Sequence, residues 1–197
     1  MIASPIEFSP ILTIDLNALR LTPEQFQEIC DANGDLRLEL TATGELIVMP
    51  PTGWGTSSRN SKLTTQICIW NEQTGLGEAF DSSGGFVLPN NAQRSPDVAW
   101  VEKSRIEAAN PDPNRFLPLA PDFVIELRSA TDRLSQLQAK MQEYQANGVR
   151  LGWLIDPQNR RVEIYRVNGD PEVLQSPIQL SGEDVLSGFT LDLTKIW

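Results

Sequence analysis

Two short apolar runs on either side of a predicted helix constrain the fold of this chain most strongly. Phe123 to Leu127 and Leu151 to Ile155 are almost wholly apolar, as strands in the core of a sheet are. Between them, Leu134 to Ala146 is predicted to be a helix that ends at Asn147-Gly148. Buried strands that alternate with helices indicate an α/β protein in which the helices cover a sheet.

The first quarter of the chain predicts a helix followed by a hairpin. The run Thr22-Pro23-Glu24-Gln25 combines a capping threonine, a proline at the first helical position and a glutamine that completes a capping box. Asn33-Gly34 ends this helix. Leu36 to Leu40 alternates apolar and charged residues, and Glu45 to Met49 returns after the turn at Thr43-Gly44, so the pair predicts a β-hairpin.

The remaining elements complete a mixed sheet flanked by about three helices. We expect one domain over residues 1–197, in which residues 1–35 form an N-terminal extension and helix packed on it. The last twenty residues are expected to pack on the sheet edge. The other predicted elements are a helix over 57–74, strands near 78–80, 86–88, 97–101 and 162–167, and a loop over 102–120 with a short helix after residue 104.

The composition excludes several classes of site and compartment. The chain has no histidine, which rules out a Ser-His-Asp triad, a His-Glu-x-x-His zinc site and a histidine general base. Cys30 and Cys68 are expected to be unpaired thiols. No run of about 18 apolar residues is present, so no membrane span is predicted. Met1 to Ser9 lacks the basic start and apolar centre of a secretory signal, and we expect a cytoplasmic protein.

The formal net charge of −10 argues against a surface coated in DNA-binding charge. The charge is uneven, because the stretch from Arg94 to Arg166 is close to neutral and the rest of the chain is strongly acidic. A nucleic-acid surface in that central stretch is compatible with the sequence, although composition alone does not indicate one.

Two acidic residues stand out by their position in the predicted strands. Asp97 follows Pro96 and opens a strand, and Glu126 lies inside the apolar run that begins at Phe123. A charge in a core strand is costly unless it is paired or binds a metal. One interpretation is therefore a structural ion pair of Glu126 with Arg128 or Arg133. The other is an acidic, metal-binding site around Asp97 and Glu126.

An ordered series of motifs resembles the PD-(D/E)XK nuclease superfamily. Pro96-Asp97 followed by Glu126-x-Arg128 is similar to its Pro-Asp…(Asp/Glu)-x-Lys signature. Within this superfamily, the series most closely resembles one family of restriction-endonuclease-like proteins. That family is abundant in cyanobacteria and was first catalogued as a domain of unknown function. The resemblance runs from about Leu36 to the C-terminus and also includes Leu38-Glu39-Leu40, Met49-Pro50-Pro51, Pro121 through Ser129, Lys140-x-x-x-Tyr144 and Trp153 through Pro157.

The resemblance implies a fold, an activity and a set of site residues. The implied fold is a restriction endonuclease-like core, a mixed central sheet flanked by helices. Asp97 and Glu126 are the implied ligands of Mg²⁺ or Mn²⁺, with the backbone carbonyl of Leu127 and the carboxylate of Glu39 as further candidates. Such a metal would activate water for hydrolysis of DNA phosphodiester bonds. DNA as substrate and a homodimer are the expected partners.

The third position of the signature departs from the pattern, because Arg128 stands where the family has lysine. An arginine stays charged and cannot act as a base, although it can neutralise a phosphate. The resemblance offers Lys140 as a substitute from the following helix. Asp132, just before that helix, is expected to cap it. Trp100 and Trp153 are expected to lie in the core.

Two other functions remain open at this point. Arg128 and the acidic net charge also suit a catalytically degenerate nuclease-fold module that binds nucleic acid or a protein without cleaving. A pair of acidic residues can also hydrolyse sugars, in which case no divalent metal would be needed.

Overall fold

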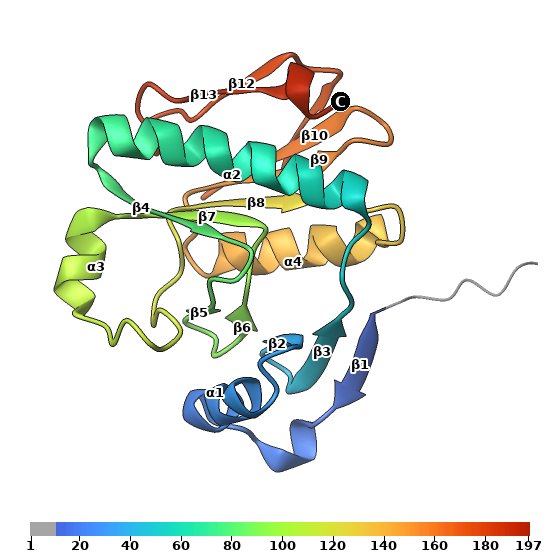
Figure 1. The fold of residues 1–197 in the computed structure, drawn as a ribbon, viewed down its shortest axis with the longest axis vertical. Helices are drawn as coiled ribbons and strands as arrows, with labels where there is room; N and C mark the ends of the chain where they lie inside the picture. Colours follow the sequence, from blue (N-terminus) through green and yellow to red (C-terminus); the bar gives the residue numbers. More distant parts are fainter. Residues whose placement is uncertain (1–10) are drawn as a thin grey trace, which may run out of the picture.

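The computed structural model describes residues 11–197, which form stacked layers of sheet and helix (Figure 1). The prediction about Met1 to Ser9 therefore lies outside the described residues. The helices are α1 (Pro23–Ala32), α2 (Trp54–Thr74), α3 (Lys103–Ala109) and α4 (Leu134–Ala146), with 3-10 turns η1 (Asn17–Leu19) and η2 (Leu193–Lys195). The strands are β1 (Leu12–Asp15), β2 (Arg37–Leu40), β3 (Glu45–Met49), β4 (Gly77–Asp81), β5 (Phe86–Val87), β6 (Gln93–Arg94), β7 (Val98–Glu102), β8 (Phe123–Leu127), β9 (Leu151–Asp156), β10 (Arg161–Arg166), β11 (Glu172–Gln175), β12 (Gln179–Ser181) and β13 (Thr190–Asp192).

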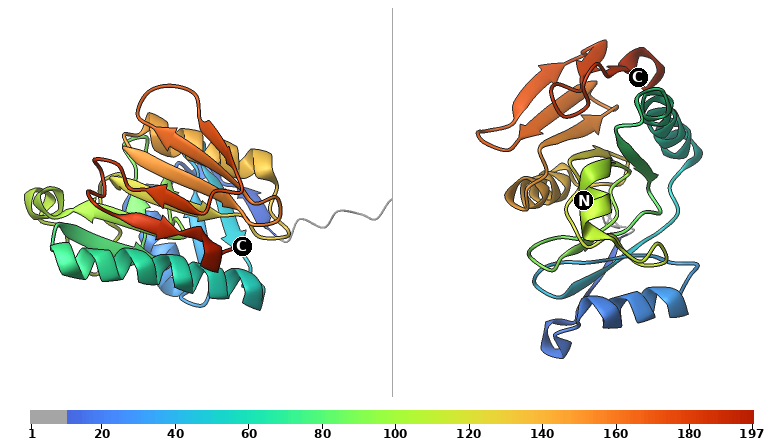
Figure 2. Two further views of the ribbon diagram at one scale, coloured as in Figure 1. Left: turned by 90° about the horizontal axis from the view of Figure 1, so that it is seen from above. Right: turned by 90° about the vertical axis from the view of Figure 1, so that its left-hand side faces the viewer.

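The central sheet has six strands in the order β11-β10-β9-β8-β7-β4. Strands β8 and β9 are parallel and the other neighbours are antiparallel, so the predicted mixed sheet is confirmed. The parallel pair requires a crossover, which α4 supplies. Helices α2 and α4 cover opposite faces (Figure 2), because alternate residues of β8 pack with Leu63 and Ile67 of α2 on one face and with Met141 of α4 on the other.

A second, smaller sheet has the order β1-β3-β2-β6-β5. The predicted hairpin forms as β2 and β3, and the predicted capping box begins α1, where Thr22 accepts a hydrogen bond from the amide of Gln25. Phe26 of α1 packs against Leu38 and Leu40 of β2. The sequence did not predict that this hairpin belongs to a second sheet, which lies below the central sheet in Figure 1.

Other predictions need correction. The C-terminal residues do not pack on the sheet edge, because the segment from β12 to η2 lies over the same face as α2 and contributes Leu186, Phe189 and Leu191 to its core. Helix α2 begins at Trp54, three residues before the predicted start. The buried positions of Trp100 and Trp153 and the free thiols of the two cysteines are confirmed. Within residues 11–197, no helix has both the length and the apolar character to cross a membrane.

Candidate functional site

Asp97 and Glu126 lie on neighbouring strands at one end of the central sheet. Asp97 directly precedes β7, which pairs with β8 in the register Val98 to Ile125. The Asp97 carboxylate continues this pairing, because its Oδ2 accepts a hydrogen bond of 2.8 Å from the amide of Leu127. Its Oδ1 accepts one of 2.8 Å from the side-chain amide of Asn60 on α2. The carboxylate is thus held from both the sheet and the helix.

Glu126 is buried and faces α4. Its Oε1 lies 2.8 Å from Lys140 Nζ and accepts a hydrogen bond of 3.0 Å from the Tyr144 hydroxyl. Lys140 and Tyr144 are four residues apart, which places both on one face of α4. The interpretation of Glu126 as the ion-pair partner of Arg128 or Arg133 is therefore wrong, since its basic partner is Lys140.

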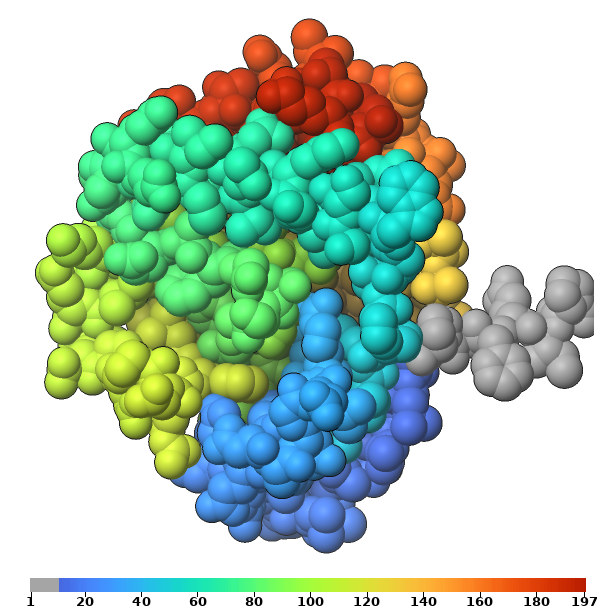
Figure 3. Space-filling model, viewed as in Figure 1, coloured from blue at the N-terminus to red at the C-terminus, as the bar shows by residue number. Residues whose placement is uncertain are grey.

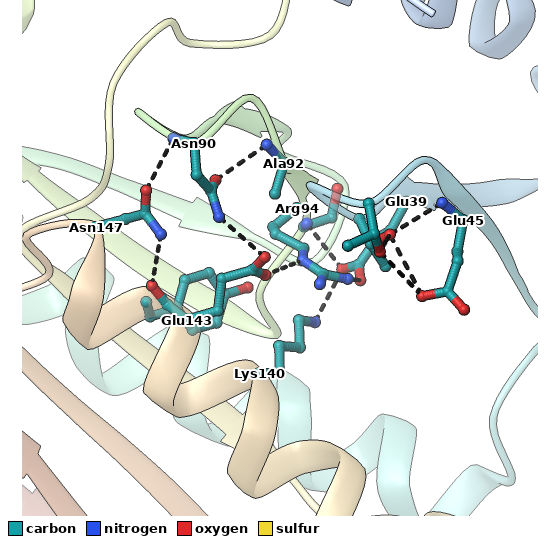
Figure 4. Close-up of polar contacts among 12 residues, drawn as sticks. Glu39, Glu45, Asn90, Ala92, Arg94, Lys140, Glu143 and Asn147 are labelled. Atoms are coloured by element: carbon teal, nitrogen blue, oxygen red, sulfur yellow. Dashed lines mark hydrogen bonds and ion pairs between the residues drawn. The ribbon is translucent and has the colours of Figure 1, made fainter. Parts of the chain in front are cut away.

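Glu39 enters the same group from the smaller sheet. Its Oε1 lies 2.8 Å from Lys140 Nζ and accepts a hydrogen bond of 2.9 Å from the amide of Ser95, while its Oε2 lies 3.1 Å from Arg94. Figure 4 shows Lys140 projecting from α4 toward Glu39 and Arg94. Lys140 therefore bridges Glu126 of the central sheet and Glu39 of the smaller one.

The network continues away from the two strand ends. Arg94 Nε lies 2.6 Å from Glu143 on α4, and Glu143 accepts a second hydrogen bond of 3.1 Å from the side chain of Asn90 (Figure 4). Arg94 is thus fixed between Glu39 and Glu143. No sequence pattern indicated Arg94 or Glu143, because they are far apart in the chain and Arg94 lies on a strand of only two residues.

Burial and charge shift the titration of these groups in different directions. Burial, with help from the nearby Asp97 and Glu39 carboxylates, raises the pKa of Glu126 to about 7 against the opposing charge of Lys140. Burial also raises the pKa of Asp97. Glu39 is equally buried, but Lys140 and Arg94 outweigh that burial and lower its pKa. The pKa of Lys140 is raised because Glu126 and Glu39 outweigh its own burial.

Arg128 lies apart from the acidic group. Its Nη1 is 2.7 Å from Asp156 Oδ2, and its Nε donates to the carbonyl of Asp132. Asp156 also accepts hydrogen bonds from Asn159 in the turn that follows β9. The predicted helix cap at Asp132 is wrong: its carboxylate accepts from the amide of Ser129, and Arg133 occupies the cap position without a side-chain bond.

The acidic group opens into a cleft of about 1080 Å³ between the two sheets. All the predicted site residues line it: Glu39, Asp97, Glu126, Leu127, Arg128 and Lys140. A second hollow of about 720 Å³ meets this cleft at Arg37 and Asp97, and Figure 3 shows it opening between the start of α2 and the start of β2. Asp97 is therefore reached from two sides.

The oxygen donors of the cleft can be compared with the ligands that a divalent metal requires. Within residues 11–197, no three acidic or cysteine side chains gather closely enough to hold a metal ion on their own. Two hard oxygen ligands, Asp97 and Glu126, are nevertheless adjacent at the strand ends, and their proximity contributes to the raised pKa of Glu126. Two acidic residues that disfavour each other's charge suit Mg²⁺ or Mn²⁺, which keeps several waters and needs few protein ligands. The residues present fit such an ion.

Comparisons with known proteins identify the family and a structural relative of the chain. Residues 23–194 match the model of the Uma2 family, which is described as "Putative restriction endonuclease". The chain belongs to this family. Its fold is also similar to that of a solved structure from Anabaena variabilis ATCC 29413, "a putative nuclease belonging to DUF820". That likeness has a TM-score of 0.73 and 20% identity, and it covers 89% of this chain and 97% of the other. A comparison with curated proteins found no match. The restriction endonuclease-like family and fold expected from the motifs are thus confirmed.

Proposed function

We propose that this member of the Uma2 family hydrolyses phosphodiester bonds of DNA with Mg²⁺ or Mn²⁺. The observation that carries the proposal is the convergence of Asp97 and Glu126 at adjacent strand ends, with Lys140 on Glu126, inside the cleft. The family match and the acidic oxygen donors support the same reaction.

Asp97 and Glu126 would hold the metal together with the backbone carbonyl of Leu127. The amide of Leu127 points to Asp97, and in a strand the amide and carbonyl of one residue face the same neighbour. When bound, the metal would polarise the phosphate and lower the pKa of a water ligand. Glu39 is the third acid of the proposed set, and it also holds Lys140 in place.

Lys140 and Arg128 act as cations in this proposal. The raised pKa of Lys140 keeps it protonated, so it stabilises negative charge on the reacting phosphate and does not serve as the base. Arg128 lines the cleft beside Leu127 and can contact a phosphate oxygen, although its position is fixed by Asp156. Lys140 thus takes the place of the lysine that the family signature has at position 128.

The proposal is tested by metal titration and DNA cleavage in the wild type and in Glu126→Gln. We expect calorimetric binding of Mg²⁺ or Mn²⁺ and metal-dependent cleavage in the wild type, with both lost in Glu126→Gln and Asp97→Asn. Glu107→Gln, which changes an exposed glutamate on α3, serves as the control and should retain both. Cleavage that survives Glu126→Gln would exclude this site, and hydrolysis without any metal would point to the sugar-hydrolase alternative.

One observation favours a second candidate function. Arg128, at the place of the signature lysine, is paired with Asp156, whereas Glu126 is paired with Lys140. A protein that binds DNA but shows no cleavage with Mg²⁺ or Mn²⁺ on any DNA tested would be a degenerate nuclease-fold module.

We also propose that the chain forms a homodimer. Among residues 11–197, strand β1 pairs with β3 alone and so lies at the sheet edge, and its Leu12 and Ile14 side chains are exposed, as at an edge that a second copy covers. Light scattering of the wild type and of Ile14→Lys tests this, and a monomeric wild type would exclude it. A cytoplasmic location stays a prediction.

A further inference from the structure

Trp54 is the most exposed large apolar side chain within residues 11–197, with 88% of its surface accessible. It differs in this from Trp70, Trp100 and Trp153, which are all buried in the core. A single exposed apolar residue on a surface is common and needs no explanation. Trp54 is distinguished by its place, because it lines the same cleft as Asp97 and Glu126.

The chain around Trp54 holds it in a fixed place at the cleft wall. Trp54 is the first residue of α2, a helix of 21 residues, and it follows the stiff Pro50-Pro51 pair that also lines the cleft. One turn further, Arg59 donates a hydrogen bond of 2.7 Å to the carbonyl of Ile196, which anchors this end of the helix. The backbone of Trp54 thus belongs to an anchored helix, while its ring is almost fully exposed.

The charge of the cleft suits an anion. Arg37, Arg59 and Arg133 line the cleft, and none of them forms an ion pair with an acidic group among residues 11–197. The cleft is lined by six basic and six acidic side chains, so it is neutral overall in a protein with a formal net charge of −10, and these three guanidinium groups are its basic groups without an acidic partner for a phosphate to replace. An exposed aromatic ring that lines the same cleft as such groups is an arrangement with which proteins bind single-stranded nucleic acid.

We propose that Trp54 stacks on an unpaired base of the nucleic acid whose phosphates the cleft arginines hold, a proposal that rests on the proposed function. The bases inside a duplex are covered by their neighbours, so only a single strand, a frayed end or an unpaired segment offers a free face to the ring. The substrate class is accordingly nucleic acid that is single-stranded where it meets the site.

The test compares the binding of two nucleic acids by the full chain without divalent metal, at one fixed salt concentration. Fluorescence anisotropy measures the affinity for a short single-stranded oligonucleotide and for the blunt duplex of the same sequence. We expect Trp54→Ala to weaken single-strand binding roughly 5- to 150-fold, the range for loss of one stacked base, with little change for the duplex. Trp54→Phe should retain most of the affinity. Ile178→Ala, at an exposed apolar residue outside the cleft, is the matched control.

Five outcomes would overturn the proposal. Unchanged single-strand affinity in Trp54→Ala, or an equal loss for both nucleic acids, would show that no unpaired base stacks there. A change from dimer to monomer in Trp54→Ala would identify Trp54 as a subunit contact. Cleavage that needs Glu126 but is unaffected by Trp54→Ala would reject this inference and leave the proposed function intact, whereas a wild type that neither binds nor cleaves nucleic acid would reject both.

Discussion

The two sheets of this molecule differ in how they are stabilised. The central sheet is covered on both faces, and its two cores contain most of the buried apolar residues, including Trp153 and Phe123. The hairpin of the smaller sheet is covered mainly by α1, and this core consists of Phe26, Leu38 and Leu40 with a few half-buried neighbours, whereas Phe86 of strand β5 belongs to one of the central cores. The stability of the molecule is therefore expected to reside in the central sheet.

The candidate site draws on both sheets. Asp97 and Glu126 belong to the well-packed central sheet, whereas Glu39 comes from the smaller one. Lys140 contacts Glu126 and Glu39 at 2.8 Å each and so connects the two. The difference indicates that Asp97 and Glu126, the proposed metal ligands, lie in the more rigid half of the site, and that Glu39, which acts on their charge through Lys140, lies in the more easily displaced half.

The largest expected effect comes from the central core. Trp153→Ala removes a fully buried ring that packs edge-on against Phe123, with centroids 4.8 Å apart. We expect it to lower the free energy of unfolding by about 3–5 kcal/mol, measured by denaturant unfolding. Val173→Ala, at an exposed residue of β11, should change that free energy by less than about 0.5 kcal/mol. A small loss for Trp153→Ala would mean that the central core is not the main source of stability.

The next expected effect separates the two sheets. Phe26→Ala empties much of the small core, so the hairpin of β2 and β3 should open locally while the central sheet stays closed. Hydrogen exchange should then accelerate at residues 37–49 and remain slow at residues 123–127. We expect a loss of about 3 kcal/mol in the opening free energy of the hairpin. Equal acceleration in both segments would show that the sheets unfold as one cooperative unit.

The sequence predicted the central sheet well because its signals are local. The apolar runs that became β8 and β9 and the capping box of α1 depend on residues within a few positions of each other. The extension of the hairpin into the smaller sheet depends instead on the pairing of Leu40 in β2 with Gln93 in β6, a contact between residues far apart in the chain. No local pattern encodes that contact, and the smaller sheet was therefore not predicted.

The candidate site shows the same difference between local signals, which the sequence reveals, and contacts between distant residues, which it does not. Asp97 and Glu126 could be found from their places in strands, but the partner of Glu126 could not, because strand alternation suggested the nearby Arg128 and not Lys140 on a helix. Only the family resemblance indicated Lys140. Arg94 and Glu143 are 49 residues apart in the chain, and nothing in the sequence pairs them. Asn60, which donates to Asp97, was missed for the same reason.

The third expected effect concerns the link between the sheets. Glu39→Gln leaves Lys140 and Arg94 with one acidic partner each, Glu126 and Glu143. Loss of this buried charge should lower the free energy of unfolding by about 2–3 kcal/mol, less than for an isolated buried pair. A double-mutant cycle with Lys140→Met measures the coupling, and Glu78→Gln, at an exposed glutamate of β4, is the control. Additive effects of the two changes would mean that Lys140 does not connect the sheets.

The smallest expected effect concerns the Arg128–Asp156 ion pair and tests whether this pair stabilises the fold at the central sheet. Burial opposes ionisation of Asp156, but hydrogen bonds from Asn159 and Arg128 outweigh it and lower the pKa of this carboxyl. Because the folded pKa lies below the unfolded one, the stabilisation is present above the unfolded pKa, near 4, and is lost as the pH falls through the folded pKa. Asp156→Asn should therefore lower the free energy of unfolding by about 1–2 kcal/mol at pH 7, and the difference from the wild type should shrink below about pH 4. Denaturant unfolding at both pH values measures it. A difference that does not depend on pH would show that the Asp156 charge does not stabilise the turn, and Arg128 would then be free to meet a phosphate.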